Sequence, residues 1–157
     1  VEDALTMVEP QLEAKRLKLS VSGPDQLWAL GDYPRTRQIL VNLLANAVKF
    51  TPQGSIQVLL EPKESQLVGV AVEDTGPGIP VELQEAIFDE FRQLDSGANR
   101  FFEGTGLGLA ISRKLAVLQR GSLTVQSALG QGSKFLLTLP AASELDPVSK
   151  PNPELLA

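Results

Sequence analysis

The chain has 157 residues, of which 43% are hydrophobic and 21% charged, so it can build one globular domain and is not disordered throughout. Cysteine and histidine are both absent, which excludes disulfides, thiolate or imidazole metal sites, cysteine nucleophiles and a Ser-His-Asp triad. The formal net charge of −5 argues against a nucleic-acid surface, and no apolar run reaches the ~20 residues of a membrane helix.

The first fifty residues are predicted to form two helices and two strands. Apolar residues at helical spacing predict the first helix, although Pro10 interrupts them, and strict alternation predicts the first strand. Asp32 is predicted to cap the second helix, in which Pro34 takes an early position where its missing N–H costs nothing. In chain order the elements are a helix over 1–16, a half-buried strand over 17–21, a short strand over 27–30 and a helix over 33–49.

The remaining elements are two hairpins and two helices. In chain order they are strands over 55–61 and 67–74, a short helix over 81–88, a polar aperiodic segment over 89–104, a helix over 105–119, and strands over 122–127 and 133–139. Hairpins without strict βαβ alternation predict an α+β fold, a two-layer sandwich in which helices cover one face of a mixed, mostly antiparallel sheet. We expect one domain over 1–140 and a flexible C-terminal tail or linker over 141–157, where three prolines occur.

Three polar residues lie on one side of the helix predicted over 33–49. Asn42, Asn46 and Lys49 have the spacing i, i+4 and i+7, which places them on one face. Asparagine is a mediocre helix former, so two of them in one helix suggest that they have polar partners. From spacing alone, a solvated helix face is the slightly better interpretation.

Three glycine-rich segments lie at the ends of predicted helices and strands. The segment 74–78 (DTGPG) comes directly after a strand, so a ligand could approach its backbone closely, although an ordinary turn explains it equally well. Gly104, Gly106 and Gly108 lead into a helix, where backbone N–H groups and the helix dipole favour a phosphate. Residues 130–133 are by themselves a hairpin turn. Together with the amides and the lysine, these turns predict a nucleotide site.

The order and spacing of these motifs resemble the ATP-binding catalytic domain of bacterial sensor histidine kinases, which belongs to an ATPase and kinase superfamily with the Bergerat fold. The resemblance covers roughly residues 1–140. Its motifs are DYPRTRQILVNLLANAVKFT (32–51), EDTGPGIP (73–80), IFDEFRQ (87–93), GTGLGLAIS (104–112) and GQGSKFLLTLP (130–140). Five motifs in family order make a specific match.

The resemblance implies a role for each matching residue. Asn46 corresponds to the asparagine that ligates Mg²⁺ at the ATP phosphates, Lys49 to the phosphate-binding lysine, and Phe50 to the ring beside the adenine. Asp74 corresponds to the carboxylate that accepts from the adenine amino group, which favours ATP over GTP because guanine has a carbonyl there. Ser133 keeps the hydroxyl of a threonine that some relatives use for a water-mediated adenine contact. The other implied nucleotide-binding positions are Gly76, Gly78, Ile79, Gly104, Thr105, Gly106, Leu107, Gly108 and Leu109.

Two features bear on the implied catalysis. Asn42 stands where ATPase relatives have a glutamate, and asparagine cannot act as a general base near neutral pH. The resemblance therefore implies phosphoryl transfer to a protein acceptor and not efficient hydrolysis. Many family members have an arginine where this chain has Gln93, and Arg92 and Arg100 are the candidates to replace it at the γ-phosphate. Residues 89–104 correspond to the lid that closes over ATP.

The resemblance thus implies an enzyme, a protein histidine kinase of a two-component phosphorelay, with ATP and Mg²⁺ as cofactors. Its partners would be a histidine-bearing dimerisation domain of the same parent protein and a downstream response regulator, with no nucleic acid and no direct membrane contact. The implied location is cytoplasmic, whether or not the parent protein is membrane-anchored. The alternatives are a serine-kinase anti-sigma relative and a degenerate nucleotide-binding or interaction module. The segment LVNLLANAVKFT (40–51) and the motif at 87–93 favour the histidine kinase, and the intact Asn46, Asp74 and glycines argue against the module.

Overall fold

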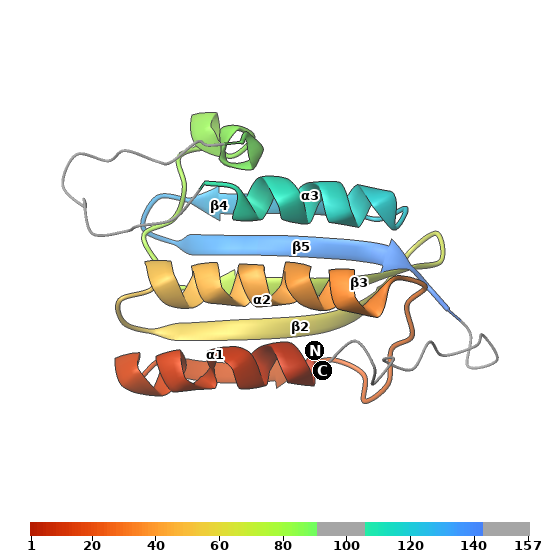
Figure 1. The fold of residues 1–157 in the computed structure, drawn as a ribbon. Coiled ribbons are helices and arrows are strands. Elements are labelled where there is room, and N and C mark those ends of the chain that lie inside the picture. The colour runs from red at the N-terminus through yellow and green to blue at the C-terminus, as the bar shows by residue number, and fades with distance from the viewer. Residues whose placement is uncertain (91–105, 143–157) are drawn as a thin grey trace, which may run out of the picture.

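A computed structural model describes residues 1–90 and 106–142. Three helices, α1, α2 and α3, lie over one face of a single five-stranded sheet (Figure 1). The helices are α1 (Glu2–Lys15), α2 (Tyr33–Phe50) and α3 (Gly108–Leu118), with two single 3₁₀ turns, η1 (Val81–Leu83) and η2 (Ala86–Phe88). The strands are β1 (Lys18–Ser22), β2 (Ser55–Lys63), β3 (Leu67–Asp74), β4 (Ser122–Ala128) and β5 (Gly132–Pro140).

The sheet has the strand order β1-β2-β3-β5-β4, in which β1 runs parallel to β2 and every other pair is antiparallel. The predicted α+β sandwich with a mixed, mostly antiparallel sheet and one helix-covered face is therefore confirmed. In the described part of the chain, no helix is both long enough and apolar enough to cross a bilayer.

The core lies between α2 and the central strands. The apolar stripe of α2 is buried, and it packs on the inward side chains of the sheet. Inward positions of directly opposed residues line up across three strands, as in Val58, Val72 and Phe135. The outward positions are more polar, so the sheet has one covered face and one open face.

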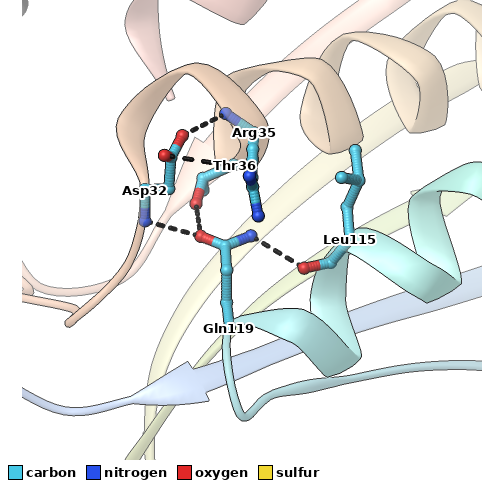
Figure 2. Close-up of polar contacts among 5 residues, drawn as sticks. All are labelled: Asp32, Arg35, Thr36, Leu115 and Gln119. Carbon is cyan, nitrogen blue, oxygen red and sulfur yellow. Dashed lines mark hydrogen bonds and ion pairs between the residues drawn. The ribbon is translucent and has the colours of Figure 1, made fainter.

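Both ends of α2 are held by side chains. At its start, the Asp32 carboxylate accepts a hydrogen bond from Arg35 N at 2.9 Å, which confirms the predicted cap. Gln119 lies just after α3, and its Oε1 accepts from Asp32 N at 2.7 Å and from Thr36 Oγ1 at 2.9 Å (Figure 2). At the other end, the Lys15 ammonium donates to the carbonyls of the last turn of α2, Val48 O at 2.6 Å among them.

Three sequence predictions about single elements are wrong in whole or in part. The strand over 27–30 is reduced to one isolated bridge, Ala29 to Ala141. The strand over 17–21 is present as the edge strand β1 (Lys18–Ser22), but it is not half-buried: its five residues are all exposed, and the buried residue is Leu17, just before it. The helix over 81–88 is two separate 3₁₀ turns, since the run is too short to sustain an α-helix.

Candidate functional site

The polar stripe of α2 runs between two glycine-rich segments. Asn42, Asn46 and Phe50 follow one another at one-turn spacing, and Asn42 and Asn46 are partly exposed. Phe50 lies eight positions after Asn42, which corresponds to roughly 12 Å along the helix axis. The Lys49 ammonium lies 5.2 Å from the centre of the Phe50 ring, at the end of the same stripe.

Asn42 contacts the N-terminal half of α3. Its Nδ2 donates a hydrogen bond to Ser112 Oγ at 3.0 Å. A Cβ atom on Gly108 would lie 2.4 Å from Asn42 Oδ1, so a larger residue there would displace this amide. Because Gly108 is the first residue of α3, the stripe of α2 reaches the N-terminus of that helix, where partial positive charge favours an anion.

Asp74 lies at the other end of the stripe, as the last residue of β3. It is directly opposite Ser133 in the β3–β5 register. Its Oδ1 accepts from Gly76 N at 2.8 Å, which folds the turn back onto the carboxylate. Partial burial raises the pKa of Asp74 above the usual value for an aspartate, and hydrogen bonds from the Gly76 and Ser133 backbone N–H groups oppose that shift.

The glycine turn after β3 packs closely against its neighbours. A Cβ on Gly76 would lie 2.9 Å from Phe50 O, which brings this turn to the C-terminal end of α2. Gly78 has a φ of +75°, and a Cβ there would lie 2.0 Å from Ala128 O at the end of β4. The turn is therefore held between α2 and the β4–β5 hairpin.

A serine that the sequence analysis did not select links these parts. Ser127 Oγ accepts from Ile79 N at 2.7 Å and donates to Gly132 O at 2.7 Å. It also lies 3.0 Å from Ser133 Oγ. The pairing of the last two predicted strands places residues 127 and 133 opposite each other, so the hairpin register was the signal that could have found it.

An open cavity of about 370 Å³ lies beside Asp74, at the end of strands β3, β5 and β4. Its lining includes Asp74, Ser127, Gln131 and Ser133. Asn42 and Asn46 do not line it. The polar residues are therefore divided between this cavity and the stripe of α2, and the Gly76 turn lies between them.

The structure thus brings most of the described site residues into two groups. Asn42 meets the start of α3, where Leu107, Gly108 and Leu109 lie, and Leu107 O accepts from Ile111 N at 2.9 Å. Asp74, with its glycine turn and Ser133, forms the second group beside Phe50. Gly106 has a φ of +68° and precedes α3. The predicted site residues that lie outside the described part of the chain are Arg92, Gln93, Arg100, Gly104 and Thr105.

Residues 31–143 match the family described as histidine kinase-, DNA gyrase B- and HSP90-like ATPases. The chain belongs to this family. It is 42% identical, over 98% of its length, to the circadian input-output histidine kinase CikA of Thermosynechococcus vestitus, of which it covers 21%. The chain therefore spans about a fifth of the length of this curated relative. The family that the motifs predicted is confirmed.

Solved histidine kinases share the fold of this ATPase-family domain. Full-length ShkA in complex with AMPPNP superimposes with a TM-score of 0.80 at 34% identity, over 94% of this chain and 30% of that one. The catalytic domain of the histidine kinase ThkA superimposes with a TM-score of 0.76 at 28% identity, over 88% of this chain and 90% of that domain. The second match covers nearly the whole of that solved catalytic domain.

Proposed function

We propose that this chain is the Mg-ATP-binding catalytic domain of a sensor histidine kinase, which transfers the γ-phosphoryl group to a histidine on a separate dimerisation domain. One observation carries the proposal: a single helix, α2, places Asn42 at the N-terminus of α3 and its last residue, Phe50, at the Asp74–Gly76 turn. An adenine recognised at one end would direct its phosphates toward the other. ShkA, a similar kinase, was solved with AMPPNP, an ATP analogue.

Adenine recognition is assigned to Asp74 and Ser133. A carboxylate accepts but does not donate hydrogen bonds, so Asp74 pairs with the adenine amino group and repels the carbonyl oxygen of guanine. The Gly76 N–H bond to Oδ1 fixes the carboxylate in place. Ser133 adds a hydroxyl opposite Asp74, and Phe50 offers a ring face beside the base.

Mg²⁺ and phosphate binding are assigned to α2 and the start of α3. Asn46 lies between the two ends of the stripe and offers an amide oxygen, a hard ligand of the kind that Mg²⁺ accepts while keeping most of its waters. When bound, the ion neutralises charge on the phosphates. Lys49 adds a positive charge one turn further on, and the N–H groups at the start of α3 supply hydrogen-bond donors for the phosphate oxygens.

Asn42 determines the type of phosphoryl transfer. An amide cannot remove a proton from water, so the site lacks a general base at the position that faces α3. Catalysis then depends on positioning and charge neutralisation, which suits transfer to a histidine that is already nucleophilic. Arg92, Gln93 and Arg100 are the candidates for contact with the γ-phosphate.

The proposed transfer is tested by adding the parent protein's histidine-bearing domain in trans. With γ-labelled ATP and Mg²⁺, label is expected on that domain and none on this chain, which has no histidine. The bond should be acid-labile, as phosphohistidine is, and a variant of the partner without its histidine serves as control. Acid-stable label on a serine would favour an anti-sigma type of kinase. ATP binding without any transfer would favour a nucleotide-binding module.

Replacing Asn46 by alanine is expected to remove the contribution of Mg²⁺ to nucleotide binding. The affinity for ATP in Mg²⁺ should fall about tenfold, toward the value measured in a chelator, because the only protein ligand assigned to the ion is lost. Calorimetric titration with and without Mg²⁺ measures both values. Gln38→Ala is the matched control, since Gln38 is an exposed polar residue of the same helix, two turns earlier. An unchanged dependence on Mg²⁺ in Asn46→Ala would refute the assignment.

A further inference from the structure

Ser112 is a buried polar residue in the middle of α3. Its residue exposure is 1%, and the buried residues of α3 on either side of it are Ala110 and Ala116. A hydroxyl in such a place costs free energy unless it is hydrogen-bonded. The bond that the structure gives it is the one from Asn42 Nδ2, across the interface between α2 and α3, at 3.0 Å.

The Asn42 amide fits a notch on α3 formed by two residues. Gly108 and Ser112 are four residues apart, so they lie one above the other on the same face of the helix. A Cβ atom at Gly108 would lie 2.4 Å from Asn42 Oδ1, 3.0 Å from Cγ and 3.2 Å from Nδ2. Gly108 therefore makes room for the whole carboxamide, and Ser112 provides its hydrogen bond. Neither residue alone would fix the amide.

We propose that Ser112 is a positioning residue that holds the Asn42 carboxamide against the first turn of α3, with its oxygen toward the phosphate-binding end of the site. The inference rests on the nucleotide site proposed above. With Nδ2 bonded to Ser112, Oδ1 is the carboxamide atom nearest to the Gly108 notch at the N-terminus of α3, so the amide is held in one orientation at the phosphate-binding end of the site. Without the hydroxyl, the amide can rotate about its last torsion and is less often in the productive arrangement.

Ser112→Ala separates this role from a merely structural one. Alanine is smaller than serine by one oxygen and is a better helix former, so α3 should stay folded, and any fall in the unfolding temperature should be limited to the loss of one hydrogen bond. The affinity for Mg-ATP and the rate of transfer to the histidine domain are nevertheless expected to fall about three- to tenfold, the range that corresponds to one hydrogen bond. ATP affinity without Mg²⁺ should change little.

A double-mutant cycle tests whether Ser112 acts through Asn42. Adding Ser112→Ala to Asn42→Ala should have no further effect, because the group being positioned is already absent. Gln119→Ala is the control for loosened helix packing, since it removes a second polar link between α2 and α3, at their far ends (Figure 2). It should lower the unfolding temperature and leave the Mg-ATP affinity unchanged.

The outcomes distinguish this inference from the proposed function. If the unmodified chain does not bind Mg-ATP, the proposed function fails. If it binds but Ser112→Ala behaves like the unmodified chain, the positioning role is overturned. The role is equally overturned if Ser112→Ala weakens binding by the same factor with and without Asn42, or if Gln119→Ala reproduces the loss.

Discussion

Replacing Asp74 by asparagine is expected to lower ATP affinity about tenfold to a hundredfold without lowering the stability of the protein. The loss corresponds to one charge-assisted hydrogen bond, worth about 1.5–3 kcal/mol, and the asparagine amide would also point a donor at the adenine amino group. The asparagine oxygen can still accept from Gly76 N, so the turn keeps its shape. Calorimetric titration gives the affinity, and thermal unfolding gives the stability.

The sign of the stability effect follows from the pKa of Asp74. Burial raises this pKa, so the folded protein binds the proton more tightly than the unfolded chain does. The charged form therefore opposes folding at neutral pH, and this cost is relieved as the pH falls through the raised pKa toward the usual aspartate value. A neutral asparagine removes that cost, so the unfolding temperature should stay level or rise.

The same pKa predicts how binding depends on pH. Adenine recognition needs the carboxylate, so ATP affinity should begin to fall at a pH above the usual aspartate range as the solution is acidified. Asp74→Asn should bind weakly at every pH and lose this dependence. Glu61→Gln is the control: Glu61 is on the neighbouring strand β2, paired with Lys63 at 2.6 Å, and should keep full affinity. Full affinity in Asp74→Asn would refute the adenine site.

Replacing Gly132 by alanine is expected to damage both the fold and the site, whereas the same change at Gly130 should damage neither severely. Both glycines have a positive φ, +83° and +75° respectively, so each substitution carries the same backbone cost of about 1–2 kcal/mol. Only at Gly132 does the new Cβ meet an atom, Asp74 O, at 1.8 Å. At Gly130 nothing lies within 4 Å.

Because the clash at Gly132 involves backbone, it must move the start of β5 away from the end of β3. The free energy of unfolding should fall by at least about twice as much as in Gly130→Ala, and ATP affinity should fall because Asp74 and Ser133 separate. Urea unfolding and nucleotide titration on the pair of variants measure the two effects. Equal losses of stability in both would contradict the close approach at Gly132.

The sequence predicted correctly those elements whose ends are marked by capping or turn residues nearby in the chain. Helix α2 has an apolar stripe, a capping Asp32 and an early Pro34, and all three are present as expected. The hairpins were recognised from their turns. The sheet order was not predicted, because the pairing of β3 with β5 and the parallel pairing of β1 with β2 join strands far apart in the chain.

The candidate site could be predicted only where its residues belong to a motif within one short stretch of the sequence. Asn42 and Asp74 belong to motifs that can be read from one stretch of chain. Ser112 and Ser127 were missed because their partners, Asn42 and Ile79, are 70 and 48 residues away. A lone serine in a helix carries no signal of its own, so only the folded structure shows what Ser112 bonds. For Ser127, the available signal was its place opposite Ser133 in the predicted hairpin.

Because both ends of α2 are fixed, this helix should tolerate substitutions better than insertions or deletions. Lys15 holds its last turn and Gln119 its first, so the helix cannot slide or turn to compensate for an altered length. One inserted or deleted residue between Asn42 and Phe50 would rotate one end of the stripe by about 100° relative to the other. Neighbouring side chains can repack around the exchange of one apolar residue for another in this segment, but not around an insertion or a deletion. Related chains should therefore vary here in residue type and not in length.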